Sequence, residues 1–389
     1  MLTALLTFVV DYGVLWLSRS QAQDAADAGA LAGAIARAYD ESANPPAANG
    51  KAFQSAQKTA QANAVWQGTP GVQVSFACPA GVVGNCVRAD VYRDGQFGST
   101  SLPMFFGKLL NISSQGVWAT ATARWVNANA TECMRPFSVA DKWINNPLTP
   151  GGTVGVYDRW TKVGGNVVEL NPHDIYTPPD GNGPAADGSG FHLGPPYPDD
   201  RGSEQTLKAG NNPNSNTDPI TPGWTLPVQL PDGAGGYEGG AANYRANIAT
   251  CVGNPVTIGN YLPTETGVMN GPTSQGFADL KATDPNAIWD GTRIANSCAP
   301  GCAPFSPRIV PIAVFDLDDF QHRRASGDWS VCPIGGRCVH VVNILGFFAD
   351  RMSGNDIVGY LMSYPGVFVN GAPSVGGGAG FLTSIQLVR

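Results

Sequence analysis

The sequence predicts an α+β protein with a long amino-terminal apolar helix, a small α+β unit and then a β-rich, loop-rich second domain. Three observations predict this order. Helix-forming residues without proline fill 18–39, short stretches of alternating apolar residues follow, and the 389 residues include 49 glycines and 31 prolines. So much glycine and proline favours turns and short strands. The length suits roughly two globular units, so we expect an apolar segment at 1–17, a first domain at 18–130 and a second at 131–389.

Residues 1–17 form the apolar segment, MLTALLTFVVDYGVLWL, which Asp11 interrupts. As a helix it would rise about 26 Å, close to the lower limit for crossing a bilayer core. We expect a partial transmembrane helix whose natural apolar segment begins before Met1, because no basic flank precedes it. The alternative is a buried helix, which Asp11 favours because an unpaired carboxylate in lipid is costly.

Residues 18–39 are expected to continue this helix. Small side chains recur along it at steps of three and four residues, which places them on one face. This small-residue stripe consists of Ala22, Ala25, Ala26, Gly29 and Gly33. Small residues let another helix backbone approach closely, so the stripe predicts a helix-packing face. Gln23 is expected on the exposed face.

The segment VDYGVLWLSRSQAQDAADAGALAGA, at 10–34, resembles the amino-terminal signature of TadG-like proteins of the Tad (Flp-type) pilus assembly family. In that family an apolar segment ends in an aspartate and a glycine, and a glutamine then precedes an Ala-Ala-Asp-Ala helix. The matching positions are Asp11, Gly13, Gln21, Ala25, Ala26, Asp27, Ala28 and Leu31. The resemblance implies a pilin-like protein anchored in the bacterial inner membrane, with its bulk periplasmic or extracellular.

The rest of the first domain is expected to combine helices and strands. Residues 50–66 have helical spacing, and 72–76, 87–91 and 117–125 alternate as strands do. Residues 102–110 read as a short amphipathic helix with its proline near the start. The order is pilin-like in outline, and the stretch MFFGKLLNISSQGVWATATARW is similar to the end of this unit in the family.

Eight cysteines, most of them in close pairs, predict disulfides in an oxidising compartment. The predicted pairs are Cys78–Cys86, Cys332–Cys338 and Cys298–Cys302, which leaves Cys133 and Cys251 as a long-range pair. The alternative is a metal site built from the last four of the eight, Cys298, Cys302, Cys332 and Cys338, with His340 nearby. Their spacing lacks the two-residue gap that is common in zinc knuckles.

The second domain is expected to hold an antiparallel sheet or sandwich, because its last third contains several alternating or apolar stretches. These stretches are 309–315, 339–348, 357–362, 367–369 and 381–388. The acids at 316–319 are expected to lie exposed at a strand end. Residues 133–143 are similar to a TadG-like motif in which a cysteine precedes a proline-aromatic pair and an acid, and we expect them to open this domain.

Residues 171–240 are rich in Gly, Pro, Asn and Asp and predict long loops. Asp180, Asn182 and Asp187 supply oxygen ligands of the kind that Ca²⁺ prefers, although their spacing does not fit an EF-hand. The alternative is that they are solvated turn residues. Many TadG-like relatives have a von Willebrand factor A-type domain with an Asp-x-Ser-x-Ser metal loop, but Asp187 is followed by Gly-Ser-Gly-Phe, so that site is not transferred.

Function is expected to lie in protein contacts rather than catalysis. The formal net charge of −7 gives no basic surface for nucleic acid, and the four histidines fit no catalytic motif. We predict a non-enzymatic Tad/Flp pilus assembly protein or minor pilin-like component, without a cofactor, whose partners are other pilus assembly or pilin-like proteins. The alternative is a membrane-anchored adhesin or ligand-binding module that depends on Ca²⁺.

Overall fold

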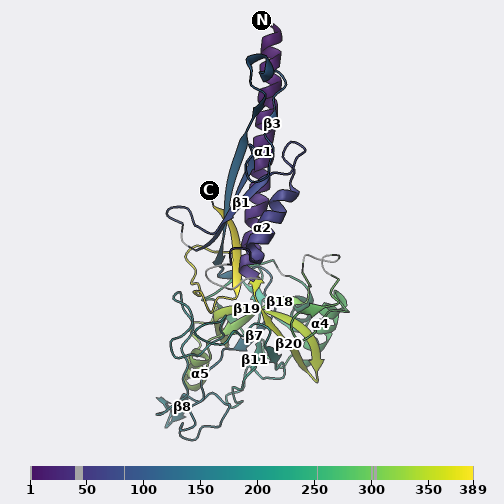
Figure 1. Ribbon diagram of the computed structural model, residues 1–389. Coiled ribbons are helices and arrows are strands. Elements are labelled where there is room, and N and C mark those ends of the chain that lie inside the picture. Colours follow the sequence, from purple (N-terminus) through teal and green to yellow (C-terminus); the bar gives the residue numbers. More distant parts are fainter. Residues whose placement is uncertain are drawn as a thin grey trace. The chain divides into compact units, whose positions relative to one another are not determined.

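The computed structural model describes residues 2–39, 47–82, 84–251, 253–298, 301 and 305–388 (Figure 1). The chain divides into two compact units, one formed by 1–126 together with 384–389 and the other by 127–383. The sequence predicted two domains in this order, but it did not predict that the last strand returns to the first unit.

The first unit begins with α1 (Leu2–Tyr39) and α2 (Lys51–Ala62), which pack against each other. Its strands are β1 (Gly71–Ser75), β2 (Asn85–Arg93), β5 (Val117–Asn127) and the end of β22 (Leu382–Val388), in the sheet order β1-β2-β5-β22. β2 pairs antiparallel with both neighbours, with Val91 opposite Val72 and Ala119. The order helix, helix, strands agrees with the expected α+β unit.

Residues 102–110 differ from the predicted amphipathic helix. Leu102–Pro103 form β3, which pairs with β4 (Ser114–Gln115), and a single 3-10 turn, η1, covers Gly107–Leu110. The segment instead forms a hairpin, because β3 pairs with β4 and backbone N–H groups at 105–107 are bound by a side chain of α1.

Among the described residues, no helix is long and apolar enough to cross a membrane. The predicted transmembrane character of 1–17 is therefore not supported.

The second unit contains a mixed sheet in the order β10-β20-β19-β18-β7-β11, with β15 paired to β19. Its strands are β7 (Phe137–Ala140), β10 (Glu204–Leu207), β11 (Thr225–Pro227), β15 (Tyr261–Pro263), β18 (Ile309–Phe315), β19 (Cys338–Ser353) and β20 (Asp356–Met362). The predicted strands at 309–315, 339–348 and 357–362 are present. At 367–369 the structure has only a bridge between Val367 and Ala130.

The central strand β18 is buried on both faces of this sheet. Val310, Ile312 and Val314 belong to one apolar cluster, whereas Ala313 and Phe315 belong to another. The first cluster also contains side chains of α3 (Ala241–Ala249) and α4 (Asn270–Ala282), and the second contains side chains of α5 (Leu317–Ser326). The strands of the last third pair antiparallel as predicted, since β19 lies between β18 and β20, but the whole sheet is mixed rather than antiparallel or a sandwich. β18 pairs in parallel with β7 and antiparallel with β19, and helices cover the sheet.

Short pairs of strands occur along the remaining chain of the second unit. They are β6 (Ala130–Thr131) with β14 (Val256–Thr257), β8 (Trp160–Val163) with β9 (Asn166–Glu169), β12 (Leu230–Pro231) with β13 (Tyr237–Glu238), β16 (Ile288–Trp289) with β17 (Ile294–Ala295), and β21 (Tyr364–Pro365) with the start of β22. Within the predicted long loops at 171–240, the structure has the strands β10 and β11 and the short pair β12–β13.

Candidate interaction surface

Asp11 joins the first half of α1 to the hairpin of the first unit. Its Oδ1 accepts a hydrogen bond from the backbone N–H of Phe105 at 2.9 Å. Its Oδ2 accepts from the N–H groups of Phe106 at 3.1 Å and Gly107 at 2.7 Å. A Cβ at Gly107 would lie 2.9 Å from the carbonyl oxygen of Ile112, so the turn requires glycine there. The carboxylate thus fixes this loop against the helix.

The charge of Asp11 is stabilised by this arrangement. Burial raises the pKa of the carboxyl, but the three backbone N–H donors together outweigh it, and the pKa lies below its ordinary value. A lowered pKa means that the contact stabilises the fold above the ordinary pKa of an aspartate and is lost as the pH falls through the lowered value. At neutral pH the contact is therefore fully formed.

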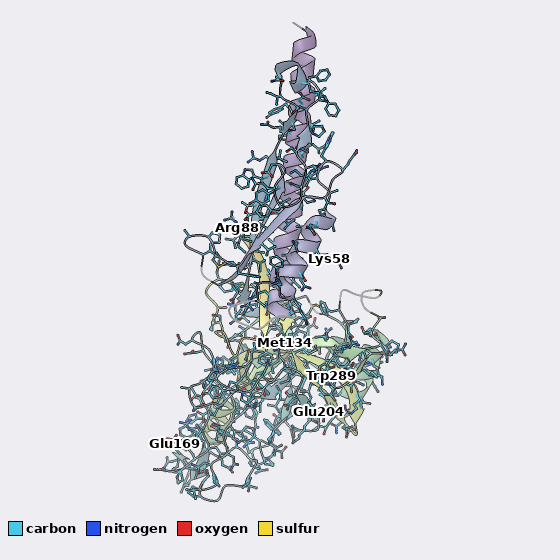
Figure 2. All side chains as sticks on the ribbon, viewed as in Figure 1. Lys58, Arg88, Met134, Glu169, Glu204 and Trp289 are labelled. Atoms are coloured by element: carbon cyan, nitrogen blue, oxygen red, sulfur yellow. A yellow bond between two sulfur atoms is a disulfide. The ribbon has the colours of Figure 1, made fainter. Side chains whose placement is uncertain are left out.

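An apolar surface surrounds this contact in the first unit. Val9, Val10, Tyr12, Trp16 and Leu17 of α1, with Phe105, Phe106 and Ile112 of the hairpin, are each between 38% and 68% exposed. We call these eight residues the amino-terminal apolar surface. Figure 2 shows rings projecting outward along this end of the helix. Grouped exposed apolar side chains are typical of a protein or membrane contact site.

The buried residues of the same helix explain why these side chains face outward. Asp11, Val14 and Ser18 are buried at steps of three and four residues, so they form the inner face of this part of α1. Tyr12 and Trp16 lie four residues apart on the outer side. The apolar run at 1–17 predicted a partial transmembrane helix, and its pattern did not separate these two faces.

Replacing Asp11 by alanine is expected to loosen the hairpin, because three backbone N–H groups lose their acceptor at once. Hydrogen exchange at the amides of 105–107 should become faster. Asp24→Ala serves as the matched control, because Asp24 is an exposed acid of the same helix. Equal protection of these amides in both variants would contradict the role assigned to Asp11.

The small-residue stripe packs inside the first unit. Ala22, Ala25 and Ala26 are fully buried. A Cβ at Gly29 would lie 2.8 Å from Ala60 Cβ, and a Cβ at Gly33 would lie 2.6 Å from a Val87 methyl carbon. The stripe therefore contacts α2 and β2 of its own chain. The predicted helix-packing face thus has its contacts inside the first unit rather than on another protein.

The two glutamines near the stripe are also engaged. Gln21 accepts a hydrogen bond from the backbone N–H of Trp66 at 2.8 Å. Gln23 donates to Asp27 at 2.9 Å and to the carbonyl oxygen of Thr120 at 3.1 Å. Gln23 is half-buried rather than on an exposed face, which corrects the sequence analysis.

Three of the predicted disulfides are present. Cys78–Cys86 lies in the first unit, and Cys133–Cys251 and Cys332–Cys338 lie in the second. The fourth predicted pair includes Cys302, which lies outside the described residues. Disulfides agree with the predicted oxidising compartment.

The candidate Ca²⁺ ligands Asp180 and Asp187 stabilise turns by accepting hydrogen bonds from backbone N–H groups. Asp180 accepts from the backbone N–H of Asn182 at 2.7 Å, and Asp187 accepts from that of Ser189 at 2.8 Å. In the part of the chain that the structure describes, no three His, Cys, Asp or Glu side chains are grouped so as to hold a metal ion. The acids after β18 also differ from the prediction, because Asp316 is buried and caps α5 by accepting from Asp318 and Asp319.

Asp141 is a buried acid of the second unit that the sequence analysis did not single out as a site. Because β7 and β18 are parallel, their carboxyl ends place Asp141 and Asp316 at the same edge of the sheet. The Asp141 carboxylate accepts hydrogen bonds from the N–H groups of Lys142 and Phe191 and from the Tyr176 hydroxyl. These contacts tie the end of β7 to the loops at 176 and 191.

The pKa of Asp141 is strongly perturbed. Burial raises the pKa to about 7, and the negative charge of Asp316 adds to this effect. The hydrogen bonds that the carboxylate accepts from Lys142, Tyr176 and Phe191 lower the pKa and offset part of this rise. Asp141 also lines a hollow of about 400 Å³ together with Lys142, Asp200 and Glu204. A pKa near neutrality suits acid–base chemistry. Asp141 is only 1% exposed, however, and its carboxylate accepts three hydrogen bonds. We therefore interpret its role as structural.

The first unit is thus an α+β module with two packed helices and an exposed apolar end. Residues 1–38 match the family model described as putative Flp pilus-assembly TadE/G-like. The match covers most of α1, including the small-residue stripe and the helical part of the amino-terminal apolar surface. It confirms the resemblance of this segment to the Tad family. No curated protein and no solved structure matches the chain.

Proposed function

We propose that this chain is a non-enzymatic component of Tad/Flp pilus assembly, or a minor pilin-like subunit, that acts through protein–protein contacts at the cell envelope. The observation that carries the proposal is the family match over 1–38. The same helix presents Val9, Tyr12, Trp16 and Leu17 outward. The occupant that we assign to the amino-terminal apolar surface is another pilus assembly or pilin-like protein.

Two features of the first unit support this assignment. The buried face of α1 is complete, because its small residues pack on α2 and β2, so binding a partner requires no rearrangement of that face. The outer face holds aromatic side chains, which are enriched at the centres of protein interfaces. Asp11 fixes the hairpin, so that Phe105 and Phe106 are presented in one arrangement and cost little entropy on binding.

Leu17→Glu is expected to reduce co-purification of pilus assembly or pilin-like proteins with the full chain. A buried, unpaired charge at an interface is costly, so the retained amount should fall about tenfold or more. Ile35→Glu is the matched control, because Ile35 lies on the same helix with 48% exposure against 43% for Leu17. Quantitative mass spectrometry of the purified protein from cells measures the effect. Equal retention by the two variants would count against the proposal.

The Ca²⁺-dependent adhesin stays a prediction without a supporting observation in the described residues. A rise in the unfolding temperature when Ca²⁺ is added, reversed by a chelator, is the result that would favour it.

A further inference from the structure

A polar hollow of about 410 Å³ lies in the second unit, at the end of α5. Its wall combines Trp160 and Lys162 of β8, Arg324 of α5, and Trp329 and Arg337 of the segment before β19. No aspartate or glutamate is among the residues that line it. Three cations therefore converge on one hollow of a chain whose formal net charge is −7. The β8–β9 hairpin beside it carries Glu169, which Figure 2 labels.

Neutral groups hold the two guanidinium groups in place. Arg337 donates to the carbonyl oxygens of Pro213 and Ser215 at 2.7 and 2.8 Å, and to Asn216 Oδ1 at 2.7 Å. Arg324 donates to the carbonyl oxygen of Asp218 at 2.7 Å. Carbonyl and amide oxygens orient these side chains without neutralising their charge.

The nearby acids are engaged with other groups. Glu169 pairs with Arg159 at 2.8 Å, Asp318 accepts from Trp160 at 2.6 Å, and Asp319 pairs with Arg323 at 2.8 Å. Within the described ranges, Lys162, Arg324 and Arg337 form no ion pair with a carboxylate within 4.0 Å. Asp158 and Asp218 partly compensate the charge of Arg324, and the charges of Lys162 and Arg337 are left for a ligand.

The two guanidinium groups also affect each other. Burial lowers the pKa of Arg324, and the positive charge of Arg337 lowers it further, while Asp218 and Asp158 partly oppose both effects. Like charges held near each other in a half-buried site repel, and a bound anion removes that repulsion.

Two tryptophans give the hollow aromatic surface in addition to its positive charge. Gln321 accepts from the backbone N–H of Trp160 and thereby fixes the position of that residue. Trp329 packs on Phe320, with ring centroids 5.6 Å apart, and the Arg337 guanidinium lies 5.4 Å from its ring centroid. The Cys332–Cys338 disulfide closes the segment between Trp329 and β19. A hollow of this volume suits a small organic ligand, and indole surfaces suit the C–H face of a sugar ring.

We propose that this hollow binds an acidic sugar, meaning a pyranose ring that carries a carboxylate. The cations bind the carboxylate, and the tryptophans contact the ring. This site is separate from the amino-terminal apolar surface and requires no metal ion, so its success or failure does not depend on the proposed role in pilus assembly.

Calorimetry of the full chain with trigalacturonate tests the proposal. We expect saturable binding that weakens with added salt, that persists in the presence of a chelator, and that neutral galactotriose does not reproduce. Absence of saturable binding, or equal binding of galactotriose, would overturn it. Sodium sulfate that competes as strongly as trigalacturonate would overturn the assignment to a sugar and leave a simple anion site.

Lys162→Gln and Arg324→Gln are each expected to weaken binding about tenfold or more, because each removes a charge-assisted contact. Lys162 is exposed, so its loss should leave the fold intact. Lys281→Gln is the matched control, since Lys281 is an exposed lysine of α4 in the same unit. If Lys281→Gln weakens binding as much as Lys162→Gln, general charge attraction explains the binding and the proposed site is wrong.

Discussion

Replacing Gly29 by leucine is expected to destabilise the first unit of the protein itself. A Cβ at this position would lie 2.8 Å from Ala60 Cβ and 3.0 Å from the carbonyl oxygen of Ala56. Both atoms belong to α2, so a longer side chain must push the helices apart. Overpacking of this kind costs about 1–3 kcal/mol and sometimes more. Hydrogen exchange should show lost protection across α1, α2 and β2.

Gly13→Leu is the matched control for this experiment. Gly13 lies on the same helix, and a Cβ there would meet no atom within 4 Å. Leucine is a better helix former than glycine, so this variant should be unchanged or slightly more stable. If Gly29→Leu kept the protection of the wild-type unit and lost only its partners, the stripe would be a partner-binding face after all.

The second large effect concerns Asp141 and pH. The pKa of this carboxyl is about 7 in the folded unit, where burial raises it, against 3.8 for an unperturbed aspartate. A raised pKa means that the folded state binds the proton more tightly, so its stabilising contribution is complete below about pH 4. It is lost as the pH rises toward 7. The free energy of unfolding of the second unit should therefore fall by up to about 4 kcal/mol across this range.

Asp141→Asn should remove most of this pH dependence and stabilise the protein at pH 7. An asparagine amide retains an oxygen for backbone N–H donors but carries no charge. Denaturant unfolding at pH 4 and pH 7 measures the difference. Asp279→Asn, which removes an exposed acid paired with Arg245, should keep the wild-type decline. If the free energy of unfolding of Asp141→Asn fell between pH 4 and pH 7 as much as that of the wild type, another group would be responsible.

Local patterns in the sequence were enough to predict much of the first unit. Apolar alternation located β1, β2 and β5, and the small-residue spacing identified the buried face of α1. The location of the partner of that face was not predictable. Whether a stripe of alanine and glycine packs on its own chain or on another chain depends on where α2 folds back. That position is set by tertiary structure and not by local sequence.

The candidate surface was harder to predict. In the sequence, Asp11 is an acid inside an apolar segment. Its role as a hydrogen-bond acceptor was not visible there, because the donor lies in a loop 94 residues later. Phe105 and Phe106 lie in a segment with helical spacing, so no local pattern indicated that their backbone N–H groups would bind Asp11. In the second unit, the apolar run at 309–315 predicted the strand β18, but its parallel neighbour β7 lies far away in the sequence. Register between such distant strands has no local signature.

Photo-crosslinking in cells with a photoreactive amino acid at position 16 tests directly whether the amino-terminal apolar surface contacts pilus proteins. Trp16 is the most exposed residue of the amino-terminal apolar surface, at 68%. The same amino acid at position 35 of the same helix is the comparison. We expect adducts with pilus assembly or pilin-like proteins from position 16 and few from position 35. Equal adducts from both positions, or adducts from 16 with unrelated proteins alone, would contradict this expectation.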